Sequence, residues 1–156
     1  MKTISLIATL VLLCLQFNVL ANDKIFERIE FKQDVFGATH HIAASAGTKP
    51  VILVFFEPYT GYGLAQANTL YADFNDDFTF YGIAPAMNST ADIVANAAQQ
   101  HQVTFGVFFD ENNVISRQLK AWQHPSFIVF DSEGKQLSGA LMSVNEITQF
   151  IKTLRK

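Results

Sequence analysis

The chain has 156 residues, of which 49% are hydrophobic and 16% are charged, and its formal net charge at pH 7 is -3. This length accommodates one ordinary domain with a hydrophobic core of its own. Because Lys and Arg form no run apart from the short C-terminal stretch 152–156, we expect no nucleic-acid partner that binds through a basic patch.

The first 21 residues predict a secretory signal peptide. Lys2 precedes an apolar run from Ile4 to Leu20, and the segment closes on Val19-Leu20-Ala21. This pattern favours cleavage after Ala21, because the apolar run falls short of the ~20 residues that a membrane-spanning helix needs. A retained membrane anchor is the alternative. We therefore expect a periplasmic or secreted protein that has no membrane association after cleavage.

The only cysteine, Cys14, lies inside this predicted signal peptide. Leu13 precedes it, whereas a lipoprotein site resembles a motif with a small residue at that position. Residues 22–156 are expected to form one domain without a thiol. Lys2 is the only charged residue before them, so they carry 10 basic and 14 acidic residues. An exported domain without a disulfide must be stabilised by its own core.

The expected domain begins with a hairpin and a buried strand. Strand-like segments 26–31 and 39–42 flank a turn-like cluster at 34–37, which predicts a short β-hairpin. Residues 51–56 are apolar without alternation, as expected of a strand that is buried on both faces. This strand should lie centrally in a sheet.

Helical and strand-like segments then alternate. Apolar residues recur at helical spacing from Thr60 to Phe74, and a second buried strand is expected at 78–83. Asn88-Ser89-Thr90 reads as a helix cap before an amphipathic helix that includes Ile93 to Ala98. The same three residues match a glycosylation acceptor, which applies only in a eukaryotic host.

The last third predicts one more helix, a hairpin and a terminal helix. A strand is expected at 103–109 and a less regular helix at 114–122, which Pro125 ends. Segments 126–130 and 136–141 flank a turn that has the composition of a hairpin turn. A capping box, Ser143-Val144-Asn145-Glu146, then opens a helix with Ile147, Phe150, Ile151 and Leu154 on one stripe.

This order predicts an α/β fold with a central mixed sheet, helices on both faces and an extra N-terminal β-hairpin. Two stretches carry a family resemblance: "FKQDVFGATHHIAASAGTKPVILVFF" and "FGVFFDENNVISRQLKAWQHPSFIVFDSEGKQLSG". With the strand-to-helix turn between them, they resemble the thioredoxin-like superfamily. The closer likeness is to its exported redoxin branch of periplasmic thiol-disulfide reductases and peroxiredoxin relatives. The resemblance covers nearly all of residues 26–156.

The sequence departs from this family at the reactive motif. The family has Cys-x-x-Cys at the start of the helix after the central strand, and the resemblance places Thr60-Gly61-Tyr62-Gly63 there. Thiol chemistry needs a thiolate, which neither Thr60 nor Gly63 can supply. The resemblance also implies that Pro125 is the cis-proline beside the active site. An ordinary trans proline at the start of an edge strand is the alternative.

Polar residues near this turn leave other chemistry open. Thr60 is most simply the N-cap of the following helix. A hydrolytic arrangement of Glu57, His124 and Thr60 is an alternative, because a nucleophilic threonine needs an adjacent base. A metal site would combine His124 with His40 or His41. We expect no metal and no other cofactor, because the cysteines of the family's copper carriers are missing.

The resemblance implies a peptide-binding role that needs no cysteine. In such proteins the main chain of the residue before the cis-proline pairs with an extended peptide, opposite the helix N-terminus. We favour a degenerate, cysteine-free site that binds a peptide or protein partner in the cell envelope as a chaperone-like module. The alternatives are envelope thiol-disulfide exchange with a partner's thiols, and metal carriage. The expected binding residues are Tyr59, Thr60, Gly61, Tyr62, Trp122, His124 and Pro125.

Overall fold

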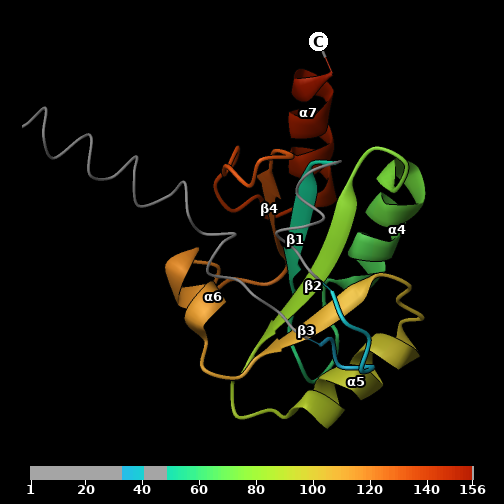
Figure 1. The fold of residues 1–156 in the computed structure, drawn as a ribbon, viewed down its shortest axis with the longest axis vertical. Coiled ribbons are helices and arrows are strands. Elements are labelled where there is room, and N and C mark those ends of the chain that lie inside the picture. The colour runs from blue at the N-terminus through green and yellow to red at the C-terminus, as the bar shows by residue number, and fades with distance from the viewer. Residues whose placement is uncertain (1–32, 41–48, 156) are drawn as a thin grey trace, which may run out of the picture.

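A computed structural model describes residues 33–40 and 49–155 of the chain (Figure 1). The predicted signal peptide and the predicted strand 26–31 lie outside these residues, as does most of segment 39–42. Within them, strands and helices alternate as β1 (Val51–Phe55), α4 (Leu64–Phe74), β2 (Thr79–Pro85), α5 (Ala91–Gln100), β3 (Gly106–Asp110), α6 (Val114–Gln118), β4 (Ser126–Phe130) and α7 (Val144–Leu154).

The strands form one mixed sheet in the order β3-β2-β1-β4. β1 is parallel to β2, and β2 is parallel to β3, whereas β4 pairs antiparallel with β1. The central place of β1 explains why its sequence is apolar at every position, since both of its faces are covered. All five of its residues are fully buried, as the sequence predicts.

Helices cover both faces of the sheet, which confirms the expected layers. Alternate side chains of β1, including Ile52 and Val54, pack with apolar residues of α4, α5 and α7. The intervening side chains, including Leu53, pack on the other face with Ile115 of α6. Figure 1 shows α6 on the opposite side of the sheet from α4 and α7. Two core layers therefore hold the four strands in place.

Helix caps agree with the sequence at two of the helices. Ser143 caps α7 by accepting a hydrogen bond from the Glu146 backbone N–H, and Glu146 Oε2 accepts one from the Met142 N–H at 2.7 Å. Thr90 caps α5 by accepting from the Ile93 N–H. These caps satisfy backbone donors that the first helical turn leaves free.

The predicted C-terminal hairpin is incomplete. β4 forms, but its expected partner 136–141 contributes only two isolated bridges, Phe127 to Leu141 and Phe130 to Gln136. Between these bridges the Ser138 hydroxyl accepts the hydrogen bond of the Val129 N–H. A side chain thus takes the place of a ladder carbonyl, and the extra residues bulge out of the sheet.

The predicted helix 114–122 is also shorter than expected. α6 ends at Gln118, because the backbone turns left-handed at Lys120 with φ 55°. The Ala121 N–H then donates to the Ser116 carbonyl and closes the helix end. Trp122 consequently lies in the connection to β4 and not on the helix.

The predicted N-terminal turn is present, whereas the strands predicted to flank it lie mostly outside the described residues. Asp34 and Ala38 are joined by a backbone hydrogen bond, and the Val35 N–H donates to the Val107 carbonyl of β3. The described residues contain no strand on either side of this turn.

Among the described helices, none is long and apolar enough to cross a membrane.

Candidate functional site

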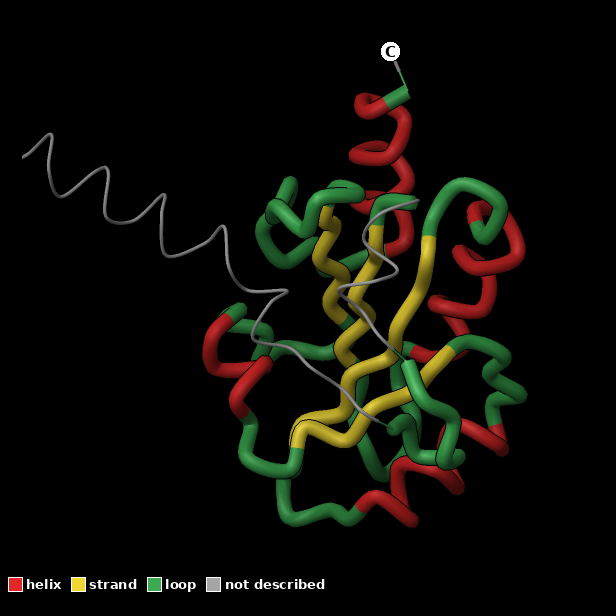
Figure 2. Tube along the Cα trace, in the orientation of Figure 1, coloured by secondary structure: helices red, strands yellow, loops and turns green. Residues whose placement is uncertain are grey.

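The residues of the expected site meet at one end of the sheet. The β1–α4 connection leaves the carboxyl end of β1, and the residues before β4 enter the sheet beside it, because β4 runs antiparallel to β1. The loops at these strand ends can be followed in Figure 2. We call residues 57–63 together with 122–125 the corner. In open α/β sheets, the carboxyl ends of the strands are where ligands commonly bind.

Glu57 organises the first half of the corner. Its Oε1 accepts a hydrogen bond from the Tyr59 N–H at 3.0 Å, and its Oε2 accepts from the Thr60 N–H at 2.7 Å and the Thr60 hydroxyl at 2.6 Å. The Gly61 N–H also donates to the Glu57 carbonyl. A single carboxylate therefore closes the turn after β1 and is held in one orientation by three donors.

Thr60 is not the N-cap of the following helix, so that expectation is wrong. α4 begins at Leu64, and its N-cap is Gly63, which makes no side-chain capping bond. The Thr60 hydroxyl instead accepts from the Tyr62 N–H at 3.2 Å while it donates to Glu57. The loop therefore continues for three residues beyond Thr60, because the local turn at Glu57 satisfies the hydroxyl group.

The register of the sheet brings His124 opposite Glu57. Phe55 pairs with Ser126, and the antiparallel register continued by two residues matches Glu57 with His124. Burial lowers the pKa of His124 from its ordinary value of 6.5, although the nearby Glu57 carboxylate opposes this effect. The imidazole is consequently neutral at pH 7.

The pKa of the Glu57 carboxyl group is lowered. Burial by itself raises this pKa, but hydrogen bonds from Thr60 and Tyr59, together with the nearby His124, outweigh burial. The group is therefore ionised at pH 7. The corner thus holds a fixed carboxylate beside a neutral imidazole.

Pro125 and Gly63 form the contact between the two halves of the corner. The peptide bond between His124 and Pro125 is cis, as the family resemblance implies. A Cβ added to Gly63 would lie 2.8 Å from the Pro125 Cβ, and Gly63 has φ 111°. Only glycine fits both the backbone conformation and the space. A side chain at position 63, including that of a cysteine, would require Pro125 to move.

His101 holds the loop from the side of α5. It is the C-cap residue of α5, and its Nε2–H donates to the Thr60 carbonyl at 2.9 Å. Its ring also lies against Gly61, where an added Cβ would approach it to 2.6 Å. No local pattern could have found this contact, since 41 residues separate the two partners.

Large apolar side chains are exposed at the corner. Tyr59, Tyr62 and Trp122 are 50%, 56% and 51% exposed. The Tyr59 hydroxyl donates to the Asn88 carbonyl at 2.7 Å, which ties the corner to the loop after β2. Met87 in that loop is also about half exposed. Clustered exposed aromatic residues are characteristic of binding surfaces.

Several polar groups around Pro125 have no partner among the described residues. The main-chain N–H and C=O of His124 make no hydrogen bond there. His124 Nε2 and the Ser126 hydroxyl are buried and also unpaired. Unpaired buried groups are rare in folded proteins and call for an explanation. The backbone N–H and C=O of His124 are thus left without a partner from residues 33–40 and 49–155.

The structure does not assemble the alternative hydrolytic site. The Thr60 hydroxyl donates directly to Glu57, and His124 makes no hydrogen bond to Thr60. A nucleophile–base pair needs that contact, whereas here the hydroxyl serves the turn. Glu57, Thr60 and His124 are thus neighbours without the connectivity of a triad.

The histidines suggested as metal ligands are also far apart in the fold. His40 packs on Tyr81 of β2 and Phe108 of β3 and bonds to Asp34 at 2.9 Å, whereas His124 precedes β4 at the other edge of the sheet. His41 lies outside the described residues. Within the described ranges, no three His, Cys, Asp or Glu side chains could hold a metal ion together.

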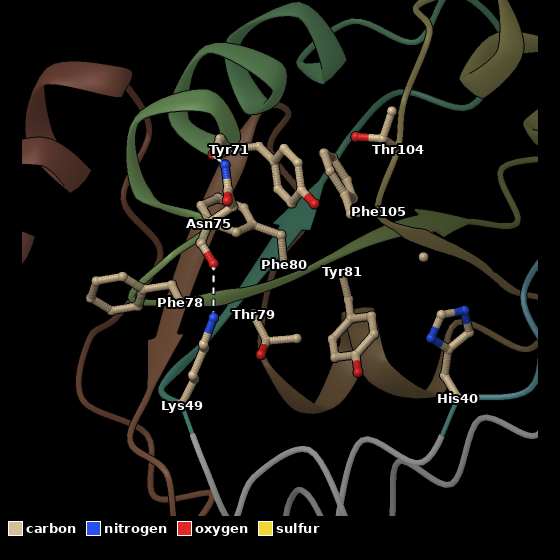
Figure 3. Close-up of a pocket in the computed structure, with 11 residues that line it drawn as sticks. His40, Lys49, Tyr71, Asn75, Phe78, Thr79, Phe80, Tyr81, Thr104 and Phe105 are labelled. Carbon is tan, nitrogen blue, oxygen red and sulfur yellow. Dashed lines mark hydrogen bonds between the residues drawn. The ribbon is translucent and has the colours of Figure 1, made fainter.

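A cavity of about 260 Å³ lies at the opposite end of the strands (Figure 3). It is lined by residues of the starts of β2 and β3, including Thr79 and Gly106, and by Tyr71 of α4. Lys49 borders it and donates to the Asn75 carbonyl. None of the corner residues contributes to this cavity.

Comparison with solved structures identifies the fold. A secreted disulfide oxidoreductase of Mycobacterium tuberculosis, homologous to E. coli DsbE, matches with a TM-score of 0.63 at 22% identity, over 81% of this chain and 98% of that one. The thioredoxin domain of a thiol-disulfide oxidoreductase from Bacteroides vulgatus gives a TM-score of 0.64 at 17% identity, over 80% and 91% of the two chains.

A thiol-disulfide oxidoreductase from Bacteroides fragilis gives the same TM-score of 0.64 at 16% identity, over 78% of this chain and 93% of that one. No family model matches the sequence, and a search of curated proteins found no match. The structural likeness establishes a thioredoxin fold, which confirms the expected fold class. The N-terminal hairpin is not part of that confirmation.

Proposed function

We propose that this thioredoxin-fold chain is an exported, chaperone-like module whose corner binds an extended peptide or a segment of a partner protein without covalent chemistry. The observation that carries the proposal is the pair of unpaired main-chain groups of His124, which lie in the same corner as three exposed aromatic side chains. Export is supported by the signal-peptide pattern of residues 1–21 and by the secreted M. tuberculosis structural neighbour.

The absence of thiols favours non-covalent binding. The sequence has one cysteine, Cys14, so residues 15–156 contain none and no disulfide can form within them. The corner offers no substitute nucleophile, because the Thr60 hydroxyl is bound to Glu57. Position 63 admits no side chain beside Pro125. The features of the corner that remain for binding are its shape, the main-chain groups of His124 and the exposed aromatic side chains.

A bound peptide would gain affinity from two sources. Its backbone would pair with the His124 N–H and C=O, as in other cases of strand addition. Its apolar side chains would lie on Tyr59, Tyr62 and Trp122, which are large amphipathic residues of the kind enriched in binding hot spots. Neither contribution requires a thiol.

Trp122 provides an intrinsic reporter for the binding test, since it is the only tryptophan of the chain and is half exposed. The full chain would be expressed and the exported product purified, and its intact mass would show whether cleavage follows Ala21. Titration with a library of cysteine-free octapeptides should shift Trp122 emission to shorter wavelength for the peptides that bind.

Site specificity is tested with two exposed aromatic residues. Tyr62→Ala should weaken binding by about fivefold or more, whereas Phe36→Ala should leave it unchanged. Phe36 is 45% exposed but lies in the loop beside β3, away from the corner. If no peptide shifts the emission, or if the two variants behave alike, the proposed binding site is wrong.

The fold of the structural neighbours supports a second candidate, envelope thiol-disulfide exchange in which a bound partner supplies the thiols. Insulin reduction by dithiothreitol distinguishes the two functions. A chain that only binds should leave the rate at that of dithiothreitol alone. An accelerated rate that is lost in the Glu57→Gln and His124→Ala double variant would favour exchange instead.

A further inference from the structure

The corner contains a negative charge, the Glu57 carboxylate, that is held in place without a balancing positive charge from the described part of the chain. The Glu57 carboxylate accepts three hydrogen bonds from Tyr59 and Thr60, so its rotamer is fixed before any ligand arrives. A carboxylate has about four positions at which it can accept hydrogen bonds, and one therefore remains for a ligand. A cation bound there would not have to order the Glu57 side chain.

No cationic side chain of the described residues neutralises this charge. The ion pairs among them join His40 to Asp34 and Arg155 to Asp77, both away from Glu57. His124 interacts electrostatically with Glu57, but burial lowers the pKa of His124, so it carries no charge at pH 7. Glu57 thus stays ionised with no counter-charge from residues 33–40 and 49–155.

The surroundings of Glu57 suit a long basic side chain better than a small cation. The exposed rings of Tyr59, Tyr62 and Trp122 belong to the same corner. The methylene stem of lysine or arginine can lie along apolar surface while its charged end reaches a carboxylate. Aromatic faces also attract ammonium and guanidinium groups.

We infer that the corner selects peptide segments in which a lysine or arginine lies next to an apolar residue, with Glu57 as the acceptor for the basic group. This inference rests on the proposed peptide binding and adds the chemical class of the ligand. Main-chain pairing at His124 would bind peptides of many sequences. The fixed Glu57 carboxylate would favour those peptides that carry a basic side chain.

The test compares three octapeptides on the unaltered protein, with Trp122 emission as the readout. Each peptide has two leucines flanking a central position, which holds lysine, norleucine or glutamate. Lysine should bind about fivefold more tightly than norleucine, and glutamate more weakly than both. Raising NaCl from about 0.05 M to about 0.5 M should largely remove the advantage of lysine.

Two variants assign the preference to Glu57. Glu57→Gln should bind the lysine and norleucine peptides equally. Asp131→Asn should keep the full preference, because Asp131 also accepts two turn N–H groups but lies in the turn after β4. Circular dichroism would show that both variants are folded. The comparison of the three peptides on the unaltered protein does not depend on either variant.

The outcomes separate this inference from the proposed function. Equal affinity of the unaltered protein for the lysine and norleucine peptides would overturn the charge selection and leave peptide binding standing. Absence of binding by all three peptides and by the wider library would overturn both. A lysine preference that survives in Glu57→Gln would place the selecting group elsewhere and overturn the role of Glu57.

Discussion

At the scale of single residues, Glu57 and His124 both have lowered pKa values, which favours the charged form of the carboxyl group and the neutral form of the imidazole. Hydrogen bonds overcome the effect of burial on Glu57, whereas burial dominates at His124. The Glu57 carboxylate accepts hydrogen bonds that stabilise its charged form. The buried Nε2 of His124 has no hydrogen-bond partner among the described residues, so no hydrogen bond at that atom offsets the cost of burying a charged imidazole. The pair makes stability depend on pH.

The direction of that dependence follows from linkage. Below pH 6.5 the unfolded chain protonates His124, while the folded chain resists protonation until its lowered pKa is reached. The free energy of unfolding therefore falls as the pH falls through this window. Glu57 acts in the same direction below pH 4.5, where the unfolded carboxyl group takes up a proton before the folded one does.

We predict that the free energy of unfolding is lower at about pH 5.5 than at about pH 7.5, and that His124→Asn reduces this difference. Urea unfolding followed by circular dichroism at both pH values would measure it. The interpretation of His124 would be wrong if the variant kept the entire pH dependence of the unaltered protein.

At the scale of elements, α5 supports the loop between β1 and α4. The contact consists of the hydrogen bond from His101 to the Thr60 carbonyl and the close approach of the ring to Gly61. The Asn68 side chain of α4 in turn donates to the His101 carbonyl at 2.6 Å. His101 thus joins two helices to the corner and fixes the loop from outside.

We predict that His101→Ala loosens this loop without unfolding the protein. Loss of a net hydrogen-bond contribution of about 1 kcal/mol should accelerate amide exchange of Gly61 and Leu64 by about fivefold. Exchange measured by NMR would detect the change. Gln99→Ala, an exposed change in the same helix, serves as the control and should leave these two amides as they are.

At the scale of the whole molecule, the fold is stabilised by its core and not by covalent links. Residues 15–156 contain no cysteine. Both faces of β1 are packed against helices, and the described core contains six fully or almost fully buried phenylalanines among its largest side chains. The stability of the molecule should therefore depend steeply on the packing of β1.

A matched pair of substitutions tests this dependence. Val54 is 0% exposed in β1, whereas Val114 is 51% exposed at the start of α6. Val54→Ala should reduce the free energy of unfolding by about 2–3 kcal/mol through lost burial and a residual cavity. Val114→Ala should change it by no more than about 0.5 kcal/mol. Similar losses for both would contradict a core centred on β1.

The sequence by itself determined the elements whose signals are local. The unbroken apolar run of 51–56 identified the central strand, and the Ser143 to Glu146 pattern located the start of α7. It also determined that no thiol is available after Cys14. Such features depend on residues that are neighbours in the sequence. The pattern of apolar residues and the pairing of a cap residue with the first helical turn are both determined within a few positions.

Only the tertiary structure decided how the corner is built. The contact between Gly63 and Pro125 and the support from His101 both join segments that are distant in sequence. Thr60 is a residue type that often caps helices, but its hydroxyl donates a hydrogen bond to Glu57 within a turn instead. Local preference for a cap is worth only ~1 kcal/mol, so competing contacts in the folded chain override it.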